Sequence, residues 1–266
     1  MRLWLVGLCI ALSSCRAADV SAVVDAGCAP EPLFGQPIAA TGLDETQCTP
    51  SCATCGSFTS PDFTDERLEA LTQWTLTTPV AELTTTPYDA PPPPNDGVCA
   101  VVVDDLAARS YHLQTFTDVA EADAAGAILT HHDACGVCST LKDFVVYARE
   151  RDVGSKVKKC GYDSFGKSFS FLVGCIEAIG FTTPCAQMWA YNTDNTRAQC
   201  FSPCIFGDQS VYQYADGRLN DCLACDEEKS GPVFKAVAGR TRRNTGLATS
   251  ICRPCSEVRP VAHAYP

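Results

Sequence analysis

The chain has 266 residues, of which 18 are cysteine, and a formal net charge of -11. Hydrophobic residues make up 46% and charged residues 19% of it, a balance that allows a buried core and excludes a disordered acidic polymer. The negative charge argues against a nucleic-acid binder, because contact with phosphate favours a cationic surface. After residue 20 no apolar run approaches the ~20 residues of a membrane-spanning helix, which excludes an internal span.

The N-terminus predicts export. Arg2 supplies a positive charge, and residues 3–12 form an apolar stretch that suits a signal-peptide core and is too short to span a bilayer. The sequence Leu-Ser-Ser-Cys that ends at Cys15 resembles the bacterial lipobox, which implies a lipid on Cys15 and a membrane anchor. We therefore predict a signal peptide over residues 1–15 and a lipoprotein of the cell envelope. Cleavage two or three residues later is the alternative and would give a secreted soluble protein.

Cysteine parity also favours export. Cys9 leaves with the signal peptide and Cys15 is either lipidated or removed, which leaves 16 cysteines, an even number. An even set suits a fully bridged exported protein. Because disulfides contribute about 2–4 kcal/mol each, we expect them to dominate the stability of this chain.

The sequence predicts no cofactor and no metal. Four CxxC pairs occur, and none is followed by histidine, which excludes covalent c-type haem. Export favours disulfides over thiolate-bound zinc. His131, His132 and Asp133 could bind a transition metal. However, neighbouring residues on a strand point to opposite faces, and capping of the following helix is the better explanation for Asp133.

The mature chain divides at residues 77–97, where six prolines without periodicity predict a stiff spacer. Residues 16–76 form an acidic N-terminal segment with four cysteines and one short helix predicted to begin at Ser60-Pro61. Residues 98–266 hold the other 12 cysteines. Since both counts are even, each part could close its own bridges.

Charge is also divided along the chain. Residues 16–130 contain 17 acids and three bases, whereas residues 131–266 contain 14 acids and 16 bases. The simpler interpretation is an acidic, solvated first half. The sharper interpretation is that the first half repels anionic surfaces while the second half presents a basic patch.

Short strands and helices are predicted in the main segment. Continuous or alternating apolar residues predict strands, and apolar residues at spacings of three and four predict helices. The fold class is α+β, a single disulfide-rich globular domain behind an acidic Thr/Pro-rich N-terminal tether. A strand is the alternative to a helix for residues 185–191, and the region after residue 201 is predicted to be rich in turns. The predicted strands cover 98–103, 111–116 and 127–131. The predicted helices are one over 118–127, one that residues 133–138 open, one over 168–179, and one that starts at Thr183-Pro184.

The first candidate site is the CGVC sequence of Cys135 and Cys138. Its surroundings, AILTHHDACGVCSTLKDF, resemble the active-site segment of thioredoxin-like redox enzymes over about 18 residues. The resemblance implies that Cys135 is a nucleophilic thiolate stabilised by a helix N-terminus and that Cys138 resolves the mixed disulfide. It also implies a proton-handling role for His132 and places Pro184 where such a fold has its cis-proline.

Two departures from that family stand in the sequence. No tryptophan precedes the CxxC, and residues 151–183 contain no clear apolar central strand. The other interpretation of Cys135 and Cys138 is that they form inert structural disulfides.

The second candidate site is a basic cluster of Lys235, Arg240, Arg242 and Arg243. A short helix is predicted to begin at Pro232 and end before Gly239, which leaves the arginines on a loop. Arginine forks suit carboxylate and phosphate groups, so the cluster could bind an anion or a partner. The alternative is a solvated loop that pairs with the acidic residues 226–228.

Two functions follow from these observations. The first is an exported, lipid-anchored, disulfide-stabilised envelope protein with a non-catalytic binding or structural role toward a protein or small-molecule ligand. The second is a thiol-disulfide oxidoreductase that uses Cys135, Cys138, His132 and Pro184. The sequence therefore leaves open whether the protein is an enzyme.

Overall fold

The structure is a computed structural model, and it describes residues 63–93, 96–150, 152–209, 212, 219–247, 251 and 259–266. It confirms the α+β class, with one mixed sheet, surrounding helices and five disulfides in the described domain. The predicted signal peptide, the proposed lipid site at Cys15 and the predicted helix start at Ser60-Pro61 lie outside the described residues. None of the described helices is long and apolar enough to cross a bilayer.

The sheet has four strands in the order β1-β3-β2-β4. The central strand β2 (Val98–Asp105) is antiparallel to both β3 (Ser110–Phe116) and β4 (Ile128–His132). Its first four residues are buried, which explains why they form a continuous apolar run. The short strand β1 (Thr75–Leu76) adds to β3 in parallel. The three strands predicted in the main segment are thus confirmed.

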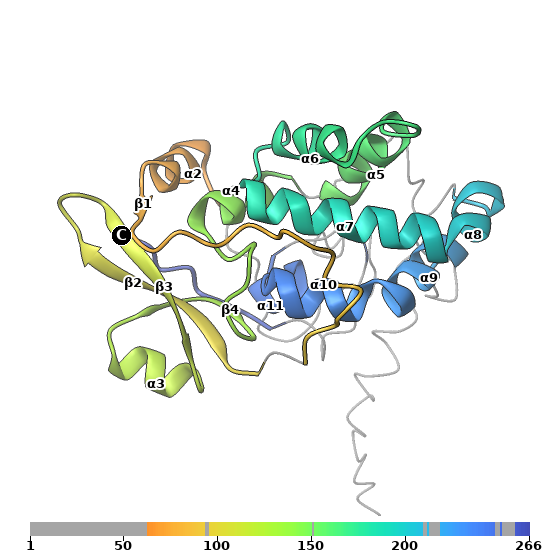
Figure 1. The fold of residues 1–266 in the computed structure, drawn as a ribbon. Coiled ribbons are helices and arrows are strands. Elements are labelled where there is room, and N and C mark those ends of the chain that lie inside the picture. The colour runs from red at the N-terminus through yellow and green to blue at the C-terminus, as the bar shows by residue number, and fades with distance from the viewer. Residues whose placement is uncertain are drawn as a thin grey trace, which may run out of the picture.

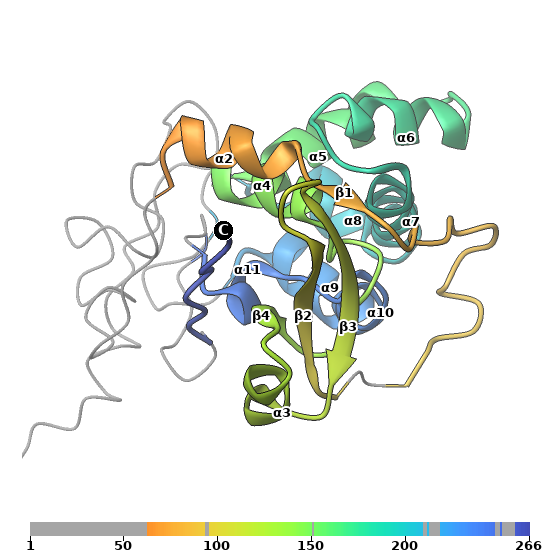
Figure 2. The same ribbon diagram turned by 90° about the vertical axis from the view of Figure 1, so that its left-hand side faces the viewer.

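Helices make up the rest of the domain (Figure 1). The long helix α7 runs through the middle, with α5 and α6 on one side and α9, α10 and α11 on the other, while α8 lies beyond the C-terminal end of α7. Figure 2 shows α2 lying beside α4. The bounds are α2 Asp65–Thr72, α3 Val119–Ala124, α4 Leu141–Arg149, α5 Val153–Asp163, α6 Phe169–Glu177, α7 Thr183–Gln199, α8 Phe201–Phe206, α9 Asp221–Lys229, α10 Gly231–Ala238 and α11 Arg242–Thr245.

Several helix boundaries differ from the predictions. The helix after β4 begins at Leu141 with Thr140 as its N-cap, so the CGVC turn precedes the helix and does not open it. The N-cap of α7 is Thr182 and not Thr183, although the helix predicted over residues 185–191 is confirmed against the strand alternative. The sequence did not predict α5. Among the described residues after 201, α8, α9 and α11 stand where turns were expected, whereas the helix predicted to begin at Pro232 and end before Gly239 is confirmed as α10.

The proline-rich segment packs against the domain instead of standing apart from it. Residues 77–93 form neither helix nor strand, yet Val80, Leu83 and Tyr88 contact the main hydrophobic core. The Leu83 amide donates to Gln187 Oε1 at 2.8 Å, which ties the segment to α7. Because β1 pairs with β3 and α2 packs on α4, the segment does not separate two packing units among the described residues.

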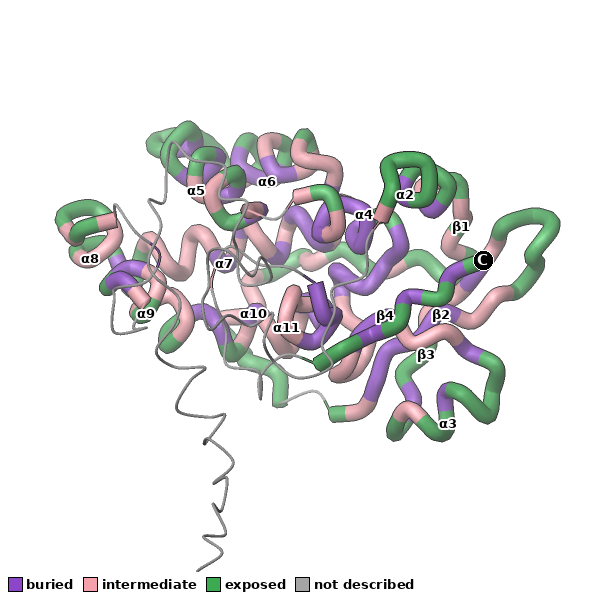
Figure 3. The backbone as a smooth tube through the Cα atoms, turned by 180° about the vertical axis from the view of Figure 1, so that it is seen from behind, coloured by how far each residue is buried: buried purple, intermediate pink, exposed green. Residues whose placement is uncertain are grey.

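The core lies where α4, the sheet and α7 meet. Phe144, Ile176 and Met188 are fully buried in one large cluster, and Figure 3 shows the buried stretches concentrated in α4 and β2. A smaller cluster packs α3 on the other side of the sheet. In contrast to these helices, α8 contributes no buried residue to either cluster.

Disulfides join neighbouring elements of the domain. Cys160–Cys175 joins α5 to α6, while Cys200–Cys225 and Cys204–Cys222 join the α7–α8 region to α9. The remaining two, Cys99–Cys135 and Cys138–Cys185, start from the CGVC turn and reach β2 and α7.

Candidate functional site

The two cysteines of the CGVC turn have different partners. Cys135 is bonded to Cys99 of β2, and Cys138 is bonded to Cys185 in the first turn of α7. Cys138 and Cys185 both have 0% of their surface exposed. The oxidoreductase alternative needs a disulfide between Cys135 and Cys138. In the structure each of them is bonded to a different cysteine outside the turn.

The backbone of the turn also lacks the feature that would activate a thiolate, because its amide groups are already bonded. Val137 N and Cys138 N donate to the carbonyl oxygens of Val237 and Ala238, each at 2.9 Å. Cys135 N donates to the Thr115 hydroxyl, and Gly136 N donates to Ser139 Oγ. The Val137 and Cys138 contacts dock the turn on the C-terminal end of α10, where helix carbonyls need donors. The turn is a structural junction.

Pro184 and His132, the other two residues of the oxidoreductase hypothesis, lie in a helix and at a backbone contact. Pro184 lies in the first turn of helix α7. His132 Nε2 lies 3.4 Å from the Pro260 carbonyl oxygen, and burial lowers the pKa of its imidazole. Asp133 does not cap the next helix as predicted. Its carboxylate accepts from Asn244 and Arg259, and its backbone has a φ of 67°.

His131, which is fully buried, forms a serine–histidine contact. Its Nδ1 lies 2.7 Å from the His132 carbonyl and must donate, so its Nε2 accepts from the Ser139 hydroxyl at 2.7 Å. Burial and the nearby Arg240 guanidinium hold the pKa of His131 well below its usual range. The ring is therefore a neutral acceptor enclosed in the core, where no substrate reaches it.

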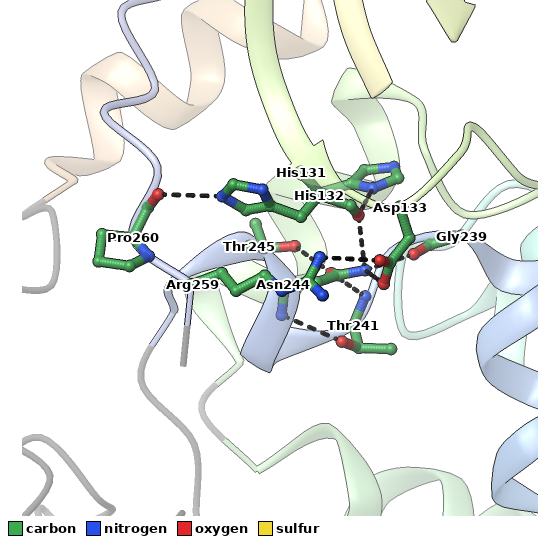
Figure 4. Close-up of polar contacts among 9 residues, drawn as sticks. All are labelled: His131, His132, Asp133, Gly239, Thr241, Asn244, Thr245, Arg259 and Pro260. Atoms are coloured by element: carbon green, nitrogen blue, oxygen red, sulfur yellow. Dashed lines mark hydrogen bonds and ion pairs between the residues drawn. The ribbon is translucent and has the colours of Figure 1, made fainter. Parts of the chain in front are cut away.

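Asn244 joins this region to the C-terminal part of the chain (Figure 4). Its side-chain amide donates to the carbonyls of His132 and Gly239 and to Asp133 Oδ2, at 2.7 to 3.0 Å. Its Oδ1 accepts from the backbone N–H of Thr241, which completes a capping box for α11. The side chain thus holds β4, the end of α10 and α11 together.

The interpretation of Arg240 as a loop residue available to an anion is wrong. Its side chain has 0% exposure and donates to the carbonyls of Thr130, Cys138 and Ser139 and to the Thr130 hydroxyl. Its guanidinium also lies over the Phe144 ring, 5.2 Å from the centroid. Four oxygen acceptors and an aromatic face replace the water that a buried cation loses. Arg240 therefore stabilises the core.

The other three members of the basic cluster line a cavity of about 320 Å³ between α5, α7, α9, α10 and α11. That volume is in the range of small-molecule sites. Its walls are largely apolar and include an aromatic pair, Trp189 and Phe234, whose ring centroids are 4.5 Å apart. Trp189 Nε1 donates to the Tyr147 hydroxyl at 3.1 Å, which fixes the indole in the wall.

One end of the cavity, which we call the basic end, consists of Lys235, Arg242, Arg243 and Glu227. The Glu227 carboxylate accepts from Lys235 Nζ at 2.9 Å and from Arg243 Nη2 at 3.2 Å. Arg242 donates to the Tyr147 carbonyl at 2.7 Å and lies over the Tyr147 ring. The predicted pairing of the cluster with an acidic neighbour is confirmed for Lys235 and Arg243, which both pair with Glu227.

The other end, which we call the aromatic end, consists of Tyr162 and Phe165 near the end of α5 and Phe201 and Ile205 on α8. All four side chains are more than a third exposed. The Arg197 guanidinium lies 4.8 Å from the centroid of Phe165 and is paired with Asp194 at 2.7 Å. This end is an apolar rim that opens to the surface.

Polar groups line the wall between the two ends. Asp226 accepts hydrogen bonds from Thr196 and Asn192, and burial raises the pKa of its carboxyl. Lys158 lies over the Tyr162 ring and donates to Gln209, and burial lowers the pKa of its ammonium. Sequence reasoning did not find these residues, because each comes from a separate element and none belongs to a motif.

Among the described residues, no group of three or more histidine, cysteine or acidic side chains could hold a metal ion.

Residues 169–261 match the model of a family of unknown function, DUF8771. The matching segment begins with α6 and includes α7 to α11, so it covers both the basic end and α8 but leaves out the sheet and α5. No curated protein and no solved structure matches the chain.

Proposed function

We propose that this protein is an exported, lipid-anchored binding protein of the cell envelope, and that it holds a small organic ligand in the cavity between α5, α7, α9, α10 and α11. The observation that carries the proposal is the cavity itself, with its largely apolar walls and a few polar groups that converge on it. That combination is typical of ligand-binding sites.

The disulfides give this cavity a preformed shape. Cys160–Cys175 holds α5, and the two bridges to α9 hold the segment that contains Phe201 and Ile205. A wall that is rigid before binding loses less conformational entropy when a ligand enters, which favours affinity. The bridges therefore support binding as well as stability.

The same disulfides support export. All ten cysteines among the described residues are paired, and such bridges form and persist outside the reducing cytoplasm. Anchoring is supported by the lipobox-like sequence at Cys15. Mass spectrometry of the mature N-terminus tests it: we expect a diacylglyceryl group on Cys15, and an unmodified terminus beyond residue 15 would overturn the anchor.

Binding is tested with two tryptophan substitutions on α9. Leu223 lines the cavity, whereas its neighbour Ala224 is exposed and does not. Leu223→Trp should fill the space, and Ala224→Trp adds the same side chain outside it. We expect native mass spectrometry to find a co-purifying small molecule on the exported protein and on Ala224→Trp, and none on Leu223→Trp. Equal occupancy of the two variants would contradict binding in this cavity.

A further inference from the structure

The two ends of the cavity differ in chemistry, and in Figure 1 the helices α8 and α11 lie on opposite sides of α9 and α10. The basic end carries three cationic side chains around one carboxylate. The aromatic end carries exposed apolar side chains on α5 and α8. A ligand that complements both ends must be charged at one end and apolar along the rest.

We propose that the ligand is an elongated organic anion, with its carboxylate, sulfonate or phosphate at Lys235, Arg242 and Arg243 and its apolar body extended past Trp189 toward Phe201 and Ile205. This inference rests on the proposed function and names the ligand class for that cavity. It is carried by the opposite character of the two ends and by the unusual construction of α8.

The charge at the basic end favours an anion over a cation. Five basic side chains line the cavity and three of them lie at this end, whereas the acidic lining residues are Asp226 and Glu227. The basic ones are Lys158, Arg197, Lys235, Arg242 and Arg243. Of the two acids, Asp226 accepts from the Thr196 hydroxyl and the Asn192 amide. Guanidinium forks can bind one face of an acid group while they keep their present contacts.

The helix α8 shows why an apolar chain suits the other end. A six-residue helix is too short to be stable alone, and none of its residues is buried. Two disulfides to α9 nevertheless fix it in place, with Phe201 45% exposed and Ile205 38% exposed. Exposed apolar patches lower the solubility of a protein. Because disulfides hold this patch at the mouth of the cavity, we expect a ligand to cover it.

The cavity is long enough for an alkyl chain. Trp189 and Arg197 both line it, and because they are eight positions apart on α7, the rise between them is about 12 Å. Small-molecule sites bury most of the ligand surface. A single chain of roughly that length would therefore lie along α7 with its acid group at the basic end.

The experiment compares three probes with one tail and different head groups: dodecanoate, dodecanol and dodecyltrimethylammonium. Binding to the mature, disulfide-intact protein is measured by calorimetry and by the fluorescence of Trp189, which lies in the wall. Because a charge-assisted hydrogen bond is worth about a factor of ten or more, dodecanoate should bind about tenfold tighter than dodecanol. The cationic probe should bind most weakly.

Variants separate the two ends. Arg243→Gln and Lys235→Gln should each weaken dodecanoate about tenfold and leave dodecanol unchanged, whereas Lys235→Arg should retain affinity. Lys229→Gln, on α9 and outside the cavity lining, is the matched control for charge. Ile205→Ser should weaken dodecanoate and dodecanol alike, and Phe206→Ser, which is 78% exposed and outside the lining, is its control. The thermal midpoint of each variant reports whether it is folded.

Equal affinity for the three probes, or a head-group preference that depends on Lys158 instead of the basic end, would overturn the inference. If none of the probes binds but Leu223→Trp still removes a co-purifying molecule, the ligand class is wrong and the binding function stands. If no compound distinguishes Leu223→Trp from Ala224→Trp, both proposals fail.

Discussion

Gly136 and Gly239 lie so close together that a Cβ added to Gly239 would stand 2.4 Å from the amide nitrogen of Gly136. This contact brings the CGVC turn onto the end of α10, where Val137 N and Cys138 N reach the last helix carbonyls. Gly239 also has a φ of 71°, a conformation that other residues adopt at a cost. No side chain at either position is compatible with the junction.

Gly239→Ala should therefore lower the free energy of unfolding by about 2–4 kcal/mol, from the backbone clash together with the positive φ. Gly126→Ala separates the two causes. Gly126 has a similar φ of 68°, but an added Cβ would meet nothing within 4 Å. The control should cost only about 1 kcal/mol in urea unfolding without reductant. Equal losses for the two variants would show that the contact with Gly136 has no energetic weight.

The disulfide pattern makes a second prediction. Non-reducing peptide mapping of the native protein should recover Cys99 linked to Cys135 and Cys138 linked to Cys185. Replacing Cys138 and Cys185 together by alanine should cost about 2–5 kcal/mol, because it opens a buried crosslink. A peptide in which Cys135 is bonded to Cys138 would contradict this arrangement and restore the geometric basis of a redox pair.

Arg240 supports a third prediction. Arg240→Met removes the donors that satisfy the carbonyls of Thr130, Cys138 and Ser139, and should destabilise the fold by about 3–5 kcal/mol. Arg243→Met is the matched control, because Arg243 is partly exposed and pairs with Glu227 at the surface of the cavity. Its loss should stay near 1 kcal/mol in the same urea titration. Similar losses would mean that the Arg240 network adds little.

Stability should fall in mild acid because of His263. Burial lowers the pKa of His263 to about 3, with the Arg240 and Arg67 charges acting in the same direction, against an unfolded value near 6.5. Between these values the unfolded chain binds a proton that the folded chain does not. The free energy of unfolding therefore decreases as pH falls through this window, by at most about 1.4 kcal/mol per pH unit for this group.

His263→Gln should flatten that slope, while above pH 7 the curves of variant and wild type should run parallel. His131, which is also buried and neutral, contributes in the same direction, so part of the slope should remain. Burial raises the pKa of Asp143, which opposes the trend because the folded state then binds the extra proton. Chemical denaturation at a series of pH values measures the slopes, and identical slopes below pH 6.5 would contradict the role of His263.

The sequence predicted the parts of the fold that depend on local pattern. β2 is a continuous apolar run, and α6 has apolar residues at helical spacing between Ser168 and Gly180. The start of α4 was missed because Asp133 and Thr140 are both good caps, and the contact of Gly136 with Gly239, which holds the turn on α10, leaves no sign in the local sequence.

The candidate site was predictable only in part. Lys235, Arg242 and Arg243 were found from their charge, but Arg240 in the same run is indistinguishable from them by sequence. Its acceptors Thr130 and Ser139 are about 100 residues away along the chain. The apolar wall comes from α5, α7, α8, α9 and α10, and no local pattern brings those elements together.

The proline-rich segment was predicted to be a spacer, because composition alone gives no sign of what it touches. Its contact depends on Tyr88, whose hydroxyl lies 2.8 Å from Asn192 Oδ1 and 3.0 Å from the Ser230 carbonyl oxygen. Burial and the neighbouring Asp226 raise the pKa of this hydroxyl, so it stays protonated and donates. One phenol thereby links the segment to α7 and to the junction of α9 and α10.

Tyr88→Phe should therefore release the segment without unfolding the domain. Loss of the hydroxyl should cost about 1–2 kcal/mol, and thermolysin should cut at Leu83 faster in this variant than in the wild type. Thr85→Ala, an exposed neighbour, is the control and should leave the cleavage rate unchanged. If Tyr88→Phe is cut no faster than Thr85→Ala, Val80 and Leu83 hold the segment without help from the hydroxyl.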